Sequence, residues 1–164
     1  MRPLHRFLMA AVATATLAAP LAGQRPDDQI SPRSVELMRE GEALLAKGKF
    51  VEADDVLEAS LAVDPRNRTA FVIMARVAQK QRLYGQAIRF TNKALAQEPN
   101  DLDALAVQGE AMVELGAVPR ARDNLAKLQK LCPSGCRQLT SLTTAISRGP
   151  SVASVKPPAS PKTN

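Results

Sequence analysis

Two cysteines, Cys132 and Cys136, are the residues of this 164-residue chain whose type and spacing most readily suggest chemistry. They bracket the segment Cys-Pro-Ser-Gly-Cys, whose turn residues are compatible with a Cα separation in the disulfide range. A thiol oxidoreductase usually places two residues between its cysteines, and this pair has three. Two thiolates are also suitable ligands for Cu(I). The pair therefore allows a structural disulfide, a redox site or a copper site.

Other groups that could carry out a reaction are scarce. The one histidine, His5, lies in an N-terminal segment with the pattern of an export signal. The chain has no glycine-rich phosphate loop and no recognisable arrangement of nucleophile and base. Asp54 and Asp55 are adjacent, so on a helix they do not face each other and belong to a solvated face. We expect a protein that is not an enzyme and that has no cofactor and no metal site.

Residues 1–23 have the pattern of a secretory signal peptide. Arg2, His5 and Arg6 give a positive start, and residues 7–19 form an apolar run without an acidic residue. Pro20 and the small residues after it suit a signal peptidase. The run is short and rich in alanine and threonine for a membrane span. We predict export to the periplasm, with a retained membrane anchor as the alternative.

Export changes how the charge and the cysteines are interpreted. Loss of residues 1–23 removes two of the 22 basic residues and none of the 16 acidic ones, so the formal charge falls from +6 to +4. Residues 33–147 hold 16 basic and 14 acidic residues, and a nucleic-acid partner is therefore not expected. In an exported protein a cysteine pair is usually oxidised, which favours the structural disulfide over a redox or metal site.

A period of 34 residues organises the rest of the chain. Three sets of positions recur at that step: Ala53, Ala87 and Ala121; Pro65, Pro99 and Pro133; and Gly41, Ala75 and Gly109. Such a period indicates a solenoid of stacked units. From Arg33 onwards the apolar residues follow helical spacing. Each recurring proline disfavours the α conformation in the residue before it, so the second helix of each unit should end there.

The units resemble tetratricopeptide repeats. The first has the family's small residue, glycine, aromatic, alanine and proline as Gly41, Gly48, Phe50, Ala53 and Pro65. We expect the close approach of its two helices to place Gly41 against Ala53.

The other two units depart from the pattern at a few positions. The second has Tyr84 but carries Arg82 in place of the glycine, and the third has Val118 in place of the aromatic residue. Glu40 and Gln108 stand where the family usually has an apolar residue. The resemblance covers about two thirds of the chain. It implies an all-α fold, a right-handed superhelical α-solenoid of three helix-turn-helix units.

The domain organisation follows from these units. A stack of helix pairs needs a cap over its last apolar face, and Leu139, Leu142 and Ile146 mark one face of a helix suited to that role. A disulfide between Cys132 and Cys136 would fix this cap to the third repeat. The expected parts are a signal peptide at 1–23, a flexible linker at 24–32, repeats at 34–67, 68–101 and 102–135, a capping helix at 136–148, and a disordered tail at 149–164.

In this family the first helix of each pair lines a concave groove that binds a protein or peptide. The resemblance assigns these residues to the groove: Met38, Glu42, Leu45, Thr69, Val72, Arg76, Gln79, Lys80, Asp103, Ala106, Glu110, Val113 and Glu114. Such a groove is apolar at one end, basic in the middle and acidic at the other, which suits an extended or helical peptide of mixed charge. The alternative is that these are ordinary solvated positions.

Some relatives clamp a C-terminal carboxylate with Lys and Asn at fixed groove positions. Here those positions hold Val35, Met38, Arg39, Glu42, Thr69, Val72, Ile73 and Arg76, so the clamp is not reproduced. The sequence as a whole predicts a non-enzymatic adaptor or assembly factor of the bacterial cell envelope with a protein or peptide partner. A thiol-redox or copper-handling protein is the alternative, and membrane association is expected only if residues 1–23 are retained.

Overall fold

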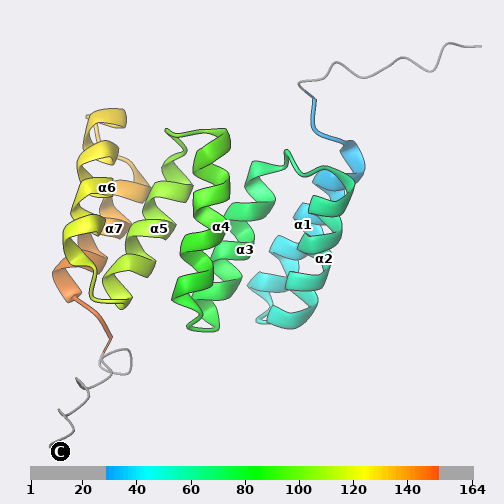
Figure 1. The fold of residues 1–164 in the computed structure, drawn as a ribbon, viewed down its shortest axis with the longest axis horizontal. Coiled ribbons are helices and arrows are strands. Elements are labelled where there is room, and N and C mark those ends of the chain that lie inside the picture. The colour runs from blue at the N-terminus through cyan, green and yellow to red at the C-terminus, as the bar shows by residue number, and fades with distance from the viewer. Residues whose placement is uncertain (1–28, 152–164) are drawn as a thin grey trace, which may run out of the picture.

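Helical periodicity and proline-terminated units produce an antiparallel stack of helices (Figure 1). The structure is a computed structural model that describes residues 29–151. The predicted signal peptide, most of the linker and most of the tail lie outside the described residues. The helices in this part of the chain are α1 (Pro32–Ala46), α2 (Phe50–Val63), α3 (Arg68–Lys80), α4 (Tyr84–Gln97), α5 (Leu102–Glu114), α6 (Val118–Leu131) and α7 (Arg137–Arg148). The predicted all-α helical solenoid is confirmed.

Because successive helices run in opposite directions, the loops fall on two opposite edges of the stack. The turns within the pairs, residues 47–49, 81–83 and 115–117, lie together with the end of α7 along one side, which we call the turn edge (Figure 1). The connections between pairs, residues 64–67, 98–101 and 132–136, lie along the other side, the connection edge. None of the helices between residues 29 and 151 is long and apolar enough to span a bilayer.

Side-chain caps and prolines fix where the helices begin and end. Asn67 caps α3 by accepting a hydrogen bond from the Ala70 amide at 3.2 Å. Asp101, and not Asn100, caps α5, since its Oδ1 accepts from the Ala104 amide at 2.8 Å. α2 ends at Val63. The next residue, Asp64, precedes Pro65 and has an extended backbone with φ −149° and ψ 102°. The proline therefore ends the helix through the conformation of its preceding residue, as expected.

The turns on the turn edge require a left-handed backbone at one residue. Gly48 and Gly116 have φ values of 74° and 77°. The equivalent residue of the second repeat is Arg82, with a φ of 61°. A side chain in this region is strained because its Cβ crowds the backbone. The departure from glycine at this position therefore leaves the fold unchanged but stores strain in the second turn.

Close helix contacts depend on small residues, and the side chain nearest to Gly41 is Leu57. Gly41 lies against Leu57 of α2, where a Cβ on the glycine would be 2.5 Å from Leu57 Cγ. The expected partner, Ala53, is fully buried one turn earlier in the same helix. Helix packing thus selects the larger side chain, because only a bulky residue fills the hollow over a glycine.

The two polar residues at an otherwise apolar repeat position have different environments. Glu40 is exposed on α1, the first helix of the described residues. Gln108 is 6% exposed and bridges α4 and α6. Its Nε2 donates to Asn92 Oδ1 at 2.7 Å, and its Oε1 accepts from Asn124 Nδ2 at 3.0 Å. A buried amide with both ends satisfied replaces the usual apolar contact at the centre of the stack.

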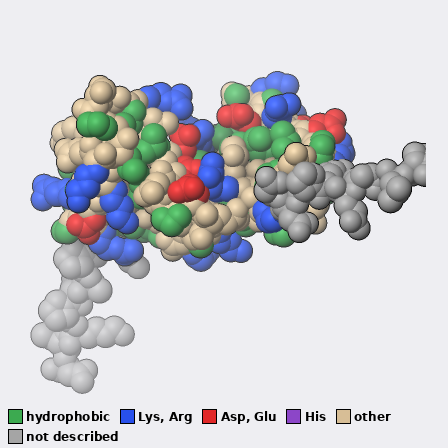
Figure 2. Space-filling view, turned by 90° about the horizontal axis from the view of Figure 1, so that it is seen from above, with side chains coloured by type: hydrophobic (Ala, Val, Ile, Leu, Met, Phe, Trp, Pro, Cys, Tyr) green, Lys and Arg blue, Asp and Glu red, His purple; other side chains and the backbone are tan. Residues whose placement is uncertain are grey.

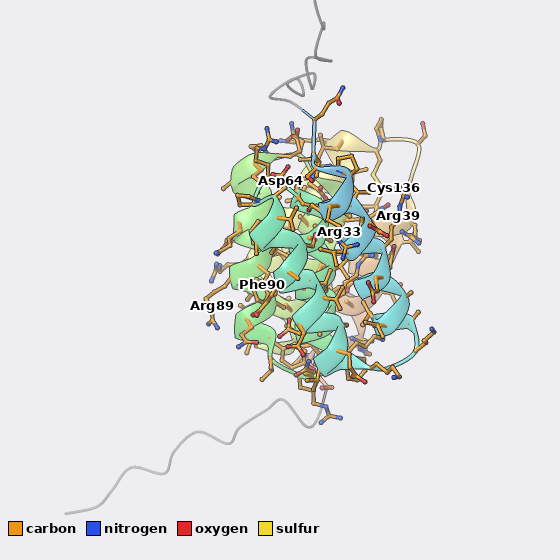
Figure 3. The ribbon with its side chains drawn as sticks, turned by 90° about the vertical axis from the view of Figure 1, so that its right-hand side faces the viewer. Arg33, Arg39, Asp64, Arg89, Phe90 and Cys136 are labelled. Carbon is orange, nitrogen blue, oxygen red and sulfur yellow. A yellow bond between two sulfur atoms is a disulfide. The ribbon has the colours of Figure 1, made fainter. Side chains whose placement is uncertain are left out.

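The start of α1 is tied to the connection edge by a buried carboxylate, labelled in Figure 3. Asp64 is 5% exposed and accepts hydrogen bonds from Arg66 Nε at 3.1 Å and from the Ser31 amide at 2.9 Å. The Arg66 guanidinium, and then the Ser31 amide, hold the pKa of Asp64 well below the usual carboxyl range. This carboxylate is therefore charged over the whole ordinary pH range and joins residue 31 to the end of α2.

Candidate functional site

The concave face of the stack is hollowed where α3, α5 and α7 lie side by side. Two adjoining cavities of about 310 and 410 Å³ open there. Figure 2 shows a notch in the upper outline of the molecule with acidic and basic side chains beside it. In Figure 3 the labelled Arg89 projects from the opposite, convex side, on α4. We call the two cavities together the groove.

Eight of the thirteen residues that the repeat register assigns to the groove line these cavities. They are Leu45, Arg76, Gln79, Lys80, Asp103, Ala106, Glu110 and Glu114. The groove therefore runs from the end of α1 across α3 and α5.

The other five assigned residues lie elsewhere. Val72 and Val113 are 3% and 0% exposed and belong to the core, which corrects their assignment to the groove wall. Val72 packs in one cluster with Ala104 and Val107 of α5, and Val113 packs in another with Leu142 of α7, so the next first-position helix covers each valine. Met38 of α1 is partly buried and packs against the core cluster that includes Leu57. Glu42 and Thr69 are exposed and line neither cavity.

The capping helix supplies groove residues that the sequence analysis did not include. Arg137, Gln138, Ser141, Thr144 and Arg148 of α7 line one or both cavities. A signal for three of them was present in the sequence, since Arg137, Thr144 and Arg148 follow Asp103, Glu110 and Glu114 by one period of 34 residues. α7 thus occupies the place of the first helix of a fourth repeat, and its polar face completes the groove.

Asp103 is the centre of a polar cluster in the first cavity. Its Oδ1 is 2.6 Å from Arg76 Nη2 of α3 and 3.2 Å from Gln138 Nε2 of α7. Arg137 Nη2 lies 3.8 Å from the same oxygen. The carboxylate therefore links three successive first helices, and its charge is already balanced within the molecule.

The other two carboxylates that α5 directs to the groove also have partners on or after α7. Glu110 accepts a hydrogen bond from the Ser141 hydroxyl. Glu114, 9% exposed, accepts from Arg148 Nη2 and from the Ser151 amide, each at 2.9 Å. α7 thus engages all three acidic residues of α5 in the groove, and the charges of Asp103 and Glu114 are balanced by arginines.

Lys80 differs from its neighbours. It lies at the end of α3, is exposed, and lines both cavities. Its ammonium group has neither a hydrogen bond nor an ion pair with any residue between 29 and 151. The adjacent Gln79 is held in place, with Nε2 donating to the Val107 carbonyl at 2.9 Å. The groove therefore presents one unpaired cation beside fixed polar groups.

The cysteines lie outside the groove, on the connection edge. Cys132 ends α6 and Cys136 precedes α7, with their sulfur atoms at disulfide-bonding distance and their Cα atoms 6.0 Å apart. Cys136 is labelled in Figure 3. Within residues 29–151 no group of three or more His, Cys, Asp or Glu side chains is placed to hold a metal ion. The geometry of this turn is compatible with the bridge that the sequence predicts.

The chain is similar in fold to several solved tetratricopeptide-repeat (TPR) domains. The first TPR domain of Spaghetti (RPAP3), bound to an HSP90 peptide, aligns with a TM-score of 0.65 and 22% identity over 71% of this chain and 91% of that domain. The TPR2B domain of yeast Sti1, in a complex with pHsp70, aligns with a TM-score of 0.65 and 19% identity over 72% and 98%.

A bacterial structure has similar scores. The type III secretion translocator chaperone SycD of Yersinia enterocolitica aligns with a TM-score of 0.62 and 19% identity over 72% of this chain and 89% of that one. No protein-family model and no curated protein sequence matches the chain. At these identities the likeness establishes the fold.

Proposed function

This chain has the tetratricopeptide-repeat fold, and on that premise we propose that it is a non-enzymatic protein-interaction adaptor or assembly factor. It binds a peptide or helix of a partner protein in the groove formed by α3, α5 and α7. Its place of action in this proposal is the bacterial cell envelope, because residues 1–23 have the pattern of an export signal.

The observation that carries the proposal is the groove itself. Two adjoining cavities form a continuous concave surface across three first helices. Concave surfaces with a few fixed polar groups are the usual binding sites of helical repeat proteins. Two structures of similar fold have peptides bound, which supports the same use here.

The charges in the groove indicate which peptide fits. The acidic residues of α5 have partners on α7, whereas Lys80 has none within the described part of the chain. A peptide carboxylate can therefore pair with Lys80 without displacing an internal contact. Leu45, which is partly exposed, offers apolar surface in the first cavity. We infer a ligand with an acidic residue next to an apolar one.

The test is affinity capture with the immobilised full chain, followed by binding measurements on peptides from each captured protein. Three proteins are compared: wild type, Lys80→Glu, and Lys127→Glu. Lys127 is a matched control because it is an exposed lysine on α6, outside the groove, without an ion pair in residues 29–151. Reversal of one charge in direct contact with a ligand carboxylate should weaken binding by about tenfold or more.

The expected result is a peptide that binds wild type and Lys127→Glu equally and binds Lys80→Glu weakly. Arg76→Glu is less informative, because it also breaks the ion pair with Asp103. Equal peptide affinity for wild type and Lys80→Glu, with a loss for Lys127→Glu, would place binding on the convex side and refute the groove assignment. Export is tested separately, by N-terminal sequencing of the chain recovered from the envelope fraction of the producing bacterium.

A further inference from the structure

Large aliphatic side chains are exposed at five places between residues 29 and 151, and three of them lie on the turn edge. Val51, Leu83 and Leu115 are 70%, 43% and 54% exposed. Each belongs to a different repeat, in or next to its turn. The other two, Val63 and Leu131, lie at the ends of α2 and α6 on the connection edge. The turn edge therefore carries one protruding aliphatic group in each repeat.

Cations accompany these aliphatic groups. Lys47, Lys80 and Arg82 lie in or beside the first two turns and have no ion pair within the described residues. The acidic residues of the turn edge, Glu52 and Glu114, are both paired, to Lys49 at 3.3 Å and to Arg148 at 2.9 Å. The net charge of this edge is therefore positive, and the unpaired charges are all cations.

The chain continues beyond α7 from the same edge. α7 runs parallel to α1, α3 and α5 and ends at the turn edge, at Arg148 (Figure 1). The last described residue, Ser151, also lies at this edge, since its amide donates a hydrogen bond to Glu114 at 2.9 Å.

We propose that the turn edge docks on the surface of an anionic phospholipid bilayer. Aliphatic side chains interleaved with Lys and Arg are the combination that binds the interface of such a bilayer, since the apolar groups enter the headgroup region and the cations pair with lipid phosphates. The aliphatic groups are spread over three turns of stacked helix pairs, whose axes lie about 10 Å apart. This spread fits an extended flat surface better than the pocket of a protein partner.

The opposite edge has a different balance of charge. The connection edge holds the acidic residues Asp64, Glu98 and Asp101, and Arg66 and Arg68 are engaged by Asp64 and Asp101. Lys130, beside the exposed Leu131, is a cation of this edge without an ion pair in residues 29–151. An anionic surface would therefore attract the turn edge more strongly than the connection edge.

The groove meets the turn edge at Lys80 and Glu114, and its first cavity extends away from that edge as far as Asp103. The lipid proposal does not rest on the groove proposal, and the charge variant below leaves Lys80 unchanged.

The test is sedimentation of the full chain with vesicles of phosphatidylcholine, with or without phosphatidylglycerol. The apolar turn-edge variant is Leu83→Ser with Leu115→Ser, and its matched control on the connection edge is Val63→Ser with Leu131→Ser. The charge variant is Lys47→Gln with Arg82→Gly, and its control is Lys127→Gln with Lys130→Gln on α6. All variants keep the same termini, so any lipid binding by residues 1–23 is common to them.

The charge variant should lose about tenfold or more of the affinity that phosphatidylglycerol adds to the vesicles. The variant removes two cations, and each cation near such a surface contributes about fivefold to the affinity. The apolar variant should also weaken binding, and both controls should bind like wild type. Raised salt should reduce the binding of wild type. Equal binding to both kinds of vesicle, or an equal loss in the controls, would overturn the proposal. Circular dichroism verifies that each variant is folded.

Discussion

Gly109 of α5 lies directly against Leu142 of α7, so closely that a Cβ on the glycine would be 2.7 Å from both Leu142 Cδ atoms. Leu142 is fully buried. This contact positions the helix that contributes Arg137, Gln138 and Ser141 to the groove. A single small residue in the third repeat therefore determines how far the cap can approach and how the groove is completed.

Gly109→Ala should destabilise the protein, because the new methyl group overlaps a buried leucine. Overpacking of this kind typically costs about 1–3 kcal/mol of unfolding free energy. Gly85→Ala is the matched control, since Gly85 is also helical and a Cβ there would meet nothing within 4 Å. That control should be neutral or stabilising by up to about 1 kcal/mol. Urea unfolding of both variants measures the difference, and equal stabilities would contradict the contact.

Arg82→Gly should stabilise the protein, because the residue at this position has a φ of 61°. Relief of the left-handed strain should raise the free energy of unfolding by about 1–2 kcal/mol. Part of this gain is offset, because glycine loses more conformational entropy on folding than other residues. Arg82→Ala removes the same side chain but keeps the strained Cβ, so it should leave stability nearly unchanged. Thermal unfolding compares the three proteins. A melting temperature of Arg82→Gly below that of Arg82→Ala would show that the entropy lost by glycine outweighs the relief of backbone strain, and would contradict the prediction.

Gln108→Leu should be destabilising although leucine is closer to the usual repeat pattern. The substitution removes the acceptor for one N–H of Asn124, which is 6% exposed and keeps its bond to the Leu105 carbonyl. It also removes the donor to Asn92, which is exposed to solvent. An unsatisfied buried polar group costs about 1–3 kcal/mol. Glu40→Leu, at the equivalent position of the exposed helix α1, should change stability by no more than about 0.5 kcal/mol. A stabilised Gln108→Leu would mean that the polar network contributes little.

Cys132 and Cys136 should be oxidised in the protein isolated from its natural compartment. Mass spectrometry after alkylation, with and without prior reduction, decides this directly. Closing so short a loop constrains the unfolded chain by about 2 kcal/mol, so Cys132→Ser with Cys136→Ser should lower stability by roughly that amount. Two free thiols in freshly isolated protein would contradict the structural disulfide and would favour the redox or copper alternative.

Asp64→Asn should lower stability at neutral pH, because the charged acceptor for Arg66 and Ser31 is lost. Hydrogen bonds to a charged group contribute about 1.5–3 kcal/mol. The pKa of Asp64 is lowered on folding, so its stabilising contribution is full above the unfolded carboxyl pKa of about 4 and falls as the pH drops below it. Unfolding curves from pH 7 to pH 2 should show the two proteins converging. A difference in unfolding free energy that stays constant over this pH range would show that the charge of Asp64 does not cause the effect.

The repeat register predicts only part of the groove. Lys80 and Glu110 were assigned to it from the repeat register alone, and both line the cavities. The same register assigned Val113, which the structure buries completely. Register specifies the direction of a residue on its own helix, whereas burial depends on which neighbouring helix covers that direction.

The sequence by itself determined the repeat, because its signals are local. A proline acts on the residue before it, and a helical face is readable within a few turns, so the ends of α2 and α4 needed no knowledge of distant parts of the chain. The tertiary structure alone decided which charges in the groove are free. Asp103 and Glu114 are engaged by Arg76 and Arg148, residues 27 and 34 positions away that only helix stacking brings together. Lys80 is left unpaired for the same reason: the charge available to a ligand depends on contacts between helices.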